Sequence, residues 1–152
     1  MVQDSNQPAA RDYNASVSAI SVEQTAKKTG VLVVDDEETV RLVLQAILRR
    51  RGLEVWVAAE GGAALQLYSQ HRDKIALVLL DVRMPGLDGP RTLTYLQRID
   101  PKVRCCFMSG YTGSYDPGDL LARGASNLLL KPIGFLELMA VINESVDSPC
   151  TT

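Results

Sequence analysis

Short apolar runs alternate along this chain with segments that have helical spacing. The apolar runs are four to six residues long and predict five β-strands. Three of them are apolar almost throughout, which is typical of strands that are covered on both faces of a sheet. The predicted strands are VLVVD (31–35), EVWVA (54–58), ALVLLD (76–81), VRCCFM (103–108) and NLLL (127–130).

The segments between these runs predict helices. A run of arginines at 49–51, followed by Gly52, indicates the end of the first helix, because cations and a following glycine favour a helix C-terminus. Asp88 is expected to cap a later helix, with Pro90 in its first turn. The first helix carries one apolar stripe that predicts its buried face. That stripe consists of Val40, Val43, Leu44, Ile47 and Leu48.

Five strand–helix units in series predict a doubly wound α/β fold, with a five-stranded parallel sheet and five helices. The folded region is expected to span residues 29–147. Residues 1–28 are rich in small polar residues and are interpreted as a mostly disordered arm. Residues 148–152 are expected to form a C-terminal tail.

Composition narrows the class of protein. The chain has 152 residues, a net charge of −2 and 46% hydrophobic residues, values that favour one soluble domain and suggest neither nucleic acid nor membrane binding. No stretch approaches the roughly 20 apolar residues of a membrane span. Cys105, Cys106 and Cys150 lack the spacing of a disulfide framework, so we expect a reduced, cytoplasmic protein. With His71 as the single histidine, a zinc site is not expected.

Polar residues stand where four of the predicted strands end. Asp35 and Asp36 close the first strand, Asp81 ends the third, Ser109 follows the fourth and Lys131 follows the fifth. Because ligands of doubly wound sheets bind at the carboxyl ends of the strands, these groups are expected to meet at one edge.

The chemistry of such a set is specific. Clustered carboxylates repel one another, and their oxygen atoms suit Mg²⁺. A carboxylate can also attack phosphorus as a nucleophile and form an acyl phosphate. The transferring phosphoryl group is then stabilised by cations and by hydrogen-bond donors, which an amine and a hydroxyl supply.

With these residues the chain resembles the receiver domains of bacterial two-component response regulators, the CheY-like family. The resemblance rests on the acidic pair in VVDDEETVR, on LLDVRMPGLDG, on MSGYTG and on KPI, and it covers about residues 29–147. It implies a flavodoxin-like fold with strand order 2-1-3-4-5.

The resemblance also implies a metal site and a phosphoacceptor. Asp81 would accept the phosphoryl group from a histidine kinase or a phosphotransfer protein. Asp36 would bind Mg²⁺ directly, Asp35 would act through metal-bound water, and the backbone carbonyl of Arg83 would complete the metal site.

Further residues would transmit the signal. Lys131 would pair with the phosphoryl group, and Ser109 would be the hydroxyl that moves toward it. The aromatic residue that the family usually carries three positions before the lysine is replaced by Leu128, so we expect a switch without a large ring movement. Arg83 and Tyr111 flank the site and are bulky enough to slow hydrolysis. The Lys131–Pro132 bond is expected to be cis.

The resemblance points to an output surface on the fourth helix, fifth strand and fifth helix, where a downstream protein or a second copy would bind. A phosphorylation-controlled switch, a phosphoryl carrier in a relay and a receiver segment of a hybrid histidine kinase remain open alternatives. The intact acid, hydroxyl and lysine set disfavours a phosphorylation-independent interaction module. We expect no enzymatic activity beyond the domain's own phosphorylation and dephosphorylation.

Two other classes fit less well. A phosphatase of the haloacid dehalogenase type needs a second acid two residues after its nucleophile, and that position is Arg83. A dinucleotide-binding domain needs a glycine-rich turn after the first strand, and DDEETV has none.

Overall fold

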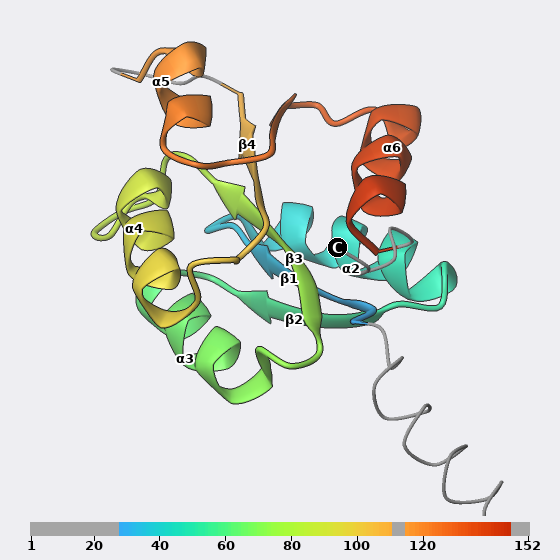
Figure 1. The fold of residues 1–152 in the computed structure, drawn as a ribbon. Coiled ribbons are helices and arrows are strands. Elements are labelled where there is room, and N and C mark those ends of the chain that lie inside the picture. Colours follow the sequence, from blue (N-terminus) through green and yellow to red (C-terminus); the bar gives the residue numbers. More distant parts are fainter. Residues whose placement is uncertain (1–27, 111–114, 147–152) are drawn as a thin grey trace, which may run out of the picture.

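A computed structural model describes residues 28–110 and 115–146, and its centre is one five-stranded parallel sheet (Figure 1). The strand order is β2-β1-β3-β4-β5, as the resemblance implied. Asn127 to Leu130 form the strand at one edge. The strands are β1 (Gly30–Val34), β2 (Glu54–Ala58), β3 (Ile75–Asp81), β4 (Cys105–Ser109) and β5 (Asn127–Leu130).

Five helices among the described residues cover the sheet in two layers (Figure 1). Helices α2 and α6 lie on one face, and α3, α4 and α5 lie on the other. The doubly wound α/β prediction is therefore confirmed. The helices are α2 (Glu38–Arg50), α3 (Gly61–His71), α4 (Gly89–Ile99), α5 (Pro117–Ala122) and α6 (Phe135–Val146).

The alternation of side chains along the central strands divides the core into two layers. In β3, Leu77 and Leu79 pack on the α2–α6 side, while Val78 and Leu80 pack on the α3–α4 side. Cys105 and Cys106 separate in the same way, as strand geometry requires. Both are buried free thiols, so neither pairs with the other.

The helix ends follow the sequence signals. Helix α2 ends at Arg50, and Gly52 has a φ of 84°, a left-handed conformation that glycine adopts without a steric penalty. The run of arginines is thus a helix end, as predicted. Asp88 caps α4, accepting a hydrogen bond of 3.0 Å from the backbone N–H of Arg91. Pro90 lies in the first turn of this helix.

One part of the predicted apolar stripe on α2 is not buried. Leu44 and Leu48 face the sheet and are covered, but Val43 is 51% exposed. It lines a groove of about 300 Å³ between α2 and the start of α6, together with residues that include Ile47 and Phe135. Only the positions that point straight at the sheet are covered completely, because α2 lies at the surface of its layer.

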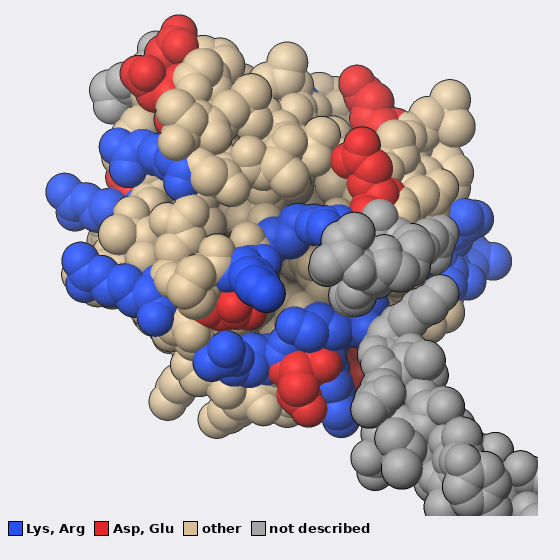
Figure 2. Space-filling model, viewed as in Figure 1, with Lys and Arg blue, Asp and Glu red and all other residues tan. Residues whose placement is uncertain are grey.

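Other differences concern boundaries. Strand β4 begins at Cys105 and not at Val103, because the backbone N–H of Val103 turns back to the carbonyl of Asp100. The predicted arm, apart from Lys28, the C-terminal tail and Tyr111 lie outside the described residues. On the face shown in Figure 2, Lys and Arg side chains lie beside Asp and Glu side chains, so charges of both signs share this surface.

Candidate functional site

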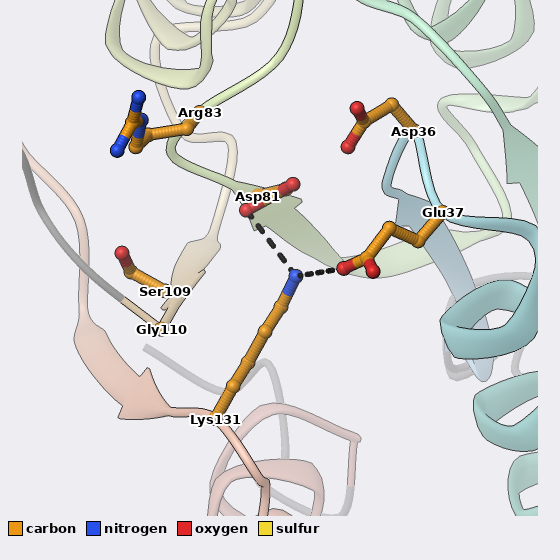
Figure 3. Close-up of a pocket in the computed structure, with 7 residues that line it drawn as sticks. All are labelled: Asp36, Glu37, Asp81, Arg83, Ser109, Gly110 and Lys131. Carbon is orange, nitrogen blue, oxygen red and sulfur yellow. Dashed lines mark hydrogen bonds and ion pairs between the residues drawn. The ribbon is translucent and has the colours of Figure 1, made fainter.

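A cavity of about 440 Å³ opens at the carboxyl ends of the strands (Figure 3). Loops after β1, β3, β4 and β5 all contribute to it, as the doubly wound topology predicts. Its walls are acidic on one side and carry one amine that points inward. The residues that line it are Asp36, Glu37, Asp81, Arg83, Ser109, Gly110 and Lys131.

Asp35 directly follows β1 and is completely buried. Its Oδ1 accepts a hydrogen bond of 2.9 Å from the backbone N–H of Glu37. The guanidinium of Arg41 donates to its backbone carbonyl at 2.8 Å. These contacts fix the turn between β1 and α2, so Asp36 is held exposed at the cavity wall.

Asp81 is the last residue of β3 and is only 5% exposed. The first turn of α4 packs directly behind it. A Cβ atom at Gly89 would collide with the carbonyl oxygen of Asp81, and the backbone N–H of Gly89 donates to Val82 at 2.9 Å. Gly86 has a φ of 75° in the connecting loop. The glycines of the MPGLDG segment thus allow α4 to press against the phosphoacceptor candidate.

Lys131 brings a cation to the centre of the acidic side chains (Figure 3). Its Nζ lies 2.8 Å from Asp35 Oδ2, 3.4 Å from Glu37 Oε1 and 3.5 Å from Asp81 Oδ1. Its backbone N–H donates to the carbonyl of Ser109 at 2.9 Å, which joins the ends of β4 and β5. The Lys131–Pro132 bond is cis, as predicted.

The carboxyl groups of the site are crowded and partly buried, and this shifts the pKa values of Asp81 and Lys131. Burial, and next the neighbouring charge of Asp35, raise the pKa of Asp81 to about 7, although Lys131 acts to lower it. Burial acts to lower the pKa of Lys131, but the carboxylates of Asp35 and Asp81 raise it overall. The lysine therefore stays charged, and it cannot alone neutralise the carboxylates around it.

These residues fit a divalent cation. Carboxylate oxygens of Asp35, Asp36 and Asp81 all lie within 4.8 Å of one another. Asp35 Oδ2 is buried, and it pairs with the ammonium group of Lys131 at 2.8 Å. Three clustered carboxyl groups with one lysine among them suit Mg²⁺, which binds one or two carboxylates and retains several waters.

The remaining predicted residues divide into two groups. Ser109 ends β4, is 1% exposed and lines the cavity. Arg83 lies at the cavity wall, and its guanidinium points away from Asp36 (Figure 3). Leu128 does not line the cavity. It lies opposite Phe107 in the sheet and packs against the core on the α3–α4 side.

The sequence reasoning did not single out two residues. Glu37 lines the cavity and lies 3.4 Å from Lys131. Glu37 directly follows Asp35 and Asp36 in the sequence, and this position indicated that it could belong to the site. Gly89 was seen only as part of a motif, and its packing against Asp81 depends on how α4 folds back on β3.

The fold and site together define a flavodoxin-like α/β domain with an acidic site at the switch point of its sheet. The sequence profile of the response regulator receiver domain family matches residues 31–143. The chain therefore belongs to this family and is a receiver domain of two-component response regulators.

Curated relatives are similar over about three quarters of the chain. It is 32% identical to the sensor kinase CckA of Brucella abortus over 77% of its own length and 12% of that protein. It is 35% identical to the transcriptional regulatory protein ZraR of Escherichia coli O157:H7, over 76% of this chain and 26% of that protein. It is 37% identical to PrrA of Mycobacterium bovis, over 72% of this chain and 46% of that protein. The chain thus spans less than half the length of each.

Solved structures of receiver domains have a similar fold. The CheX–CheY complex of Borrelia burgdorferi with BeF₃ and magnesium contains a chain that matches at a TM-score of 0.70 and 28% identity, over 76% of this chain and 87% of that one. A receiver domain from Clostridium thermocellum matches at 0.74 and 26% identity, over 78% and 94%. Among the described residues, no helix is long and apolar enough to cross a membrane.

Proposed function

We propose that this receiver domain accepts a phosphoryl group from a histidine kinase onto Asp81, with Mg²⁺ in its acidic site, and thereby changes how it binds a partner. The observation that carries the proposal is the convergence on one cavity. A nearly buried carboxylate at the end of β3 faces two further acids, a lysine 3.5 Å away and a buried serine.

In the transfer step, an Asp81 carboxylate oxygen attacks phosphorus and forms an acyl phosphate. The bond between phosphorus and the donor nitrogen breaks, and the leaving imidazole nitrogen keeps the electron pair. Lys131 supplies a positive charge to the transferring group, and the Ser109 hydroxyl can donate a hydrogen bond to it.

The proposed cation site has three contributors besides Asp81. Asp36 would be a direct ligand, the Arg83 carbonyl a second, and Asp35 would act through bound water. When bound, Mg²⁺ would neutralise the charge that builds up on the phosphoryl oxygens. The magnesium-containing complex of the Borrelia burgdorferi protein supports this choice of metal.

The output surface is proposed to be α5, β5 and α6, which follow Ser109 and Lys131 along the chain. A downstream protein would bind there, or a second copy. Among its residues, Leu121 is 43% exposed and Leu130 is 65% exposed, so apolar side chains are available to a partner. We propose a cytoplasmic location, where histidine kinases hold their phosphoryl groups, and no enzymatic activity toward other molecules.

A relay carrier is the second candidate, in which transfer to another histidine protein is itself the output. The similarity to part of a sensor kinase favours it, because a receiver attached to a kinase fits such a relay. Incubating the phosphorylated domain with phosphotransfer proteins distinguishes the two. Rapid loss of the label to such a protein supports the carrier.

The central test is intact-mass spectrometry after incubation with acetyl phosphate and Mg²⁺. The wild type should gain one phosphoryl group, and Asp81→Asn should gain none. Omission of Mg²⁺ should abolish the gain in the wild type. Labelling of Asp81→Asn to the wild-type level would refute the assignment.

The metal ligands are tested separately by titration with Mg²⁺. Asp36→Ala should weaken binding about 100-fold and Asp35→Ala about tenfold, because a direct ligand outweighs one that acts through water. Glu38→Ala, at the exposed start of α2, is the control. Equal or reversed effects of the two aspartate variants would count against this division of roles.

A further inference from the structure

Helix α5 has little apolar attachment to the domain. It is six residues long, and Leu120 is its one buried residue. Leu121, the next residue, is 43% exposed. An element with so few buried apolar contacts is displaced at low cost, so its position depends on the polar contacts that hold it.

Tyr115, at the start of this region, makes two such contacts. Its hydroxyl donates to Asp88 Oδ2 at 2.8 Å. The guanidinium of Arg123, just after α5, lies 5.3 Å from the centre of its ring. Asp88 is itself fixed, because its other carboxylate oxygen caps α4 through the N–H of Arg91.

This hydrogen bond joins two segments that leave the phosphotransfer site. Asp88 belongs to the segment after Asp81, and the next residue, Gly89, packs directly against Asp81. Tyr115 belongs to the segment after Ser109. The end of α5 has a second tie to α4, because Gln97 Nε2 donates to the carbonyl of Arg123 at 2.8 Å. Helix α5 is thus tied to α4 at both of its ends.

We infer that Tyr115 is a positioning residue of the phosphotransfer site: its hydrogen bond to Asp88 holds Tyr115, just before α5, against the start of α4 and restrains the site in its resting arrangement. This inference rests on the proposed function, in which Ser109 moves toward a phosphoryl group on Asp81. Tyr115 follows Ser109 by six positions in the sequence, and the inference is that a displacement of Ser109 changes the strength of the Tyr115–Asp88 contact. A contact made only in the resting state lowers the apparent affinity for any ligand that selects the other state.

The test is Tyr115→Phe, which keeps the ring and its contact with Arg123 and removes the hydroxyl. Fluoroberyllate with Mg²⁺, a mimic of the aspartyl phosphate, should bind this variant about three- to tenfold more tightly than the wild type, the range expected for one hydrogen bond. Phosphorylation by a low concentration of acetyl phosphate should become faster by a similar factor.

Tyr95→Phe is a matched control. The Tyr95 ring also has an arginine over it, with Arg98 at 5.1 Å from its centre. Its hydroxyl makes no hydrogen bond to any residue in the described ranges. This variant should therefore bind fluoroberyllate as the wild type does.

Two readouts separate restraint from general structural support. Damage to the fold would weaken binding, whereas loss of a restraint strengthens it. The amide NMR signals of residues 116–124 in unliganded Tyr115→Phe should also move along the line toward their positions in the fluoroberyllate complex.

Asp88→Ser keeps a residue that caps helices well and removes the acceptor for Tyr115. It should strengthen binding as Tyr115→Phe does, and the double variant should show no further gain.

Unchanged or weaker fluoroberyllate binding by Tyr115→Phe, beside a wild type that binds normally, would overturn this inference alone. A wild type that binds no fluoroberyllate and takes no phosphoryl group would overturn the proposed function, and this inference with it.

Discussion

Two tyrosines donate their hydroxyl groups to aspartates at opposite ends of α4. At the C-terminal end, Tyr68 of α3 donates to Asp100 at 2.9 Å. At the N-terminal end, Tyr115 donates to Asp88 at 2.8 Å. The first pair is buried, with Tyr68 2% and Asp100 8% exposed, whereas both members of the second are half-buried.

The same contact therefore has different consequences at the two ends. A buried carboxylate that loses its partner cannot turn to water, so breaking the Tyr68 contact is costly. A half-buried carboxylate can exchange a tyrosine hydroxyl for water at a small cost. Helices α3 and α4 also pack through Ala64, Leu93 and Leu96, while α5 contributes Leu120 alone. We call the α3 side of α4 the fixed side, because its contacts are buried, and the α5 side the adjustable side, because its contacts can be replaced at a small cost.

The largest expected effect is on packing. Leu96→Ala, on the fixed side of α4, should lower the free energy of unfolding by about 2–5 kcal/mol, because it leaves a cavity in a fully buried layer. Leu121→Ala on α5 should lower it by less than about 1 kcal/mol, because this side chain is 43% exposed. Denaturation in urea measures both. Equal losses would show that α5 is packed as firmly as α4.

Loss of the tyrosine hydroxyl should also lower stability more on the fixed side of α4 than on the adjustable side. Tyr68→Phe should cost about 1–3 kcal/mol, because it leaves a buried carboxylate oxygen of Asp100 without its partner. Tyr115→Phe should cost about 0.5–1 kcal/mol, since water can replace the hydroxyl. The same denaturation experiment applies. A larger loss for Tyr115→Phe would reverse the assignment of fixed and adjustable sides.

A smaller effect concerns pH. Burial acts to raise the pKa of Asp100, but the N–H of Lys102 and the hydroxyl of Tyr68 lower it overall. A carboxyl group with a lowered pKa in the folded state stabilises the protein above its unfolded pKa of about 3.9, and that stabilisation is lost as the pH falls through the folded value.

The stability advantage of the wild type over Asp100→Asn should therefore narrow as the pH falls below about 4. The free energy of unfolding of the two proteins, measured at pH values from about 2.5 to about 7, tests this. A constant difference in stability across that range would show that ionisation of Asp100 does not stabilise the fold.

Much of this domain follows from local sequence. The apolar runs predicted the five strands, because strands of a parallel sheet that are covered on both faces are apolar almost throughout. Asp35, Asp81, Ser109 and Lys131 lie together at one edge, as their positions at strand ends predicted. The cap at Asp88 and the helix end at Gly52 also follow from local backbone chemistry.

Contacts between distant segments could not be read in the same way. The Tyr115–Asp88 hydrogen bond joins residues 27 positions apart, and Tyr68–Asp100 joins residues 32 apart. Neither pair has a spacing that a periodic pattern reveals. The exposure of Val43 likewise depends on how α2 lies at the surface of its layer, which the periodicity of α2 alone does not reveal.

The most direct measurement compares the two sides of α4 in one amide NMR experiment with fluoroberyllate and Mg²⁺. Signals of residues 109–124 and 128–138, on the adjustable side and along β5 and α6, should shift strongly. Signals of residues 61–72 in and around α3 should shift much less, because the buried Tyr68–Asp100 contact holds that helix. Shifts confined to the residues around Asp35, Asp36 and Asp81 would contradict the account, and would favour a phosphoryl carrier that does not switch.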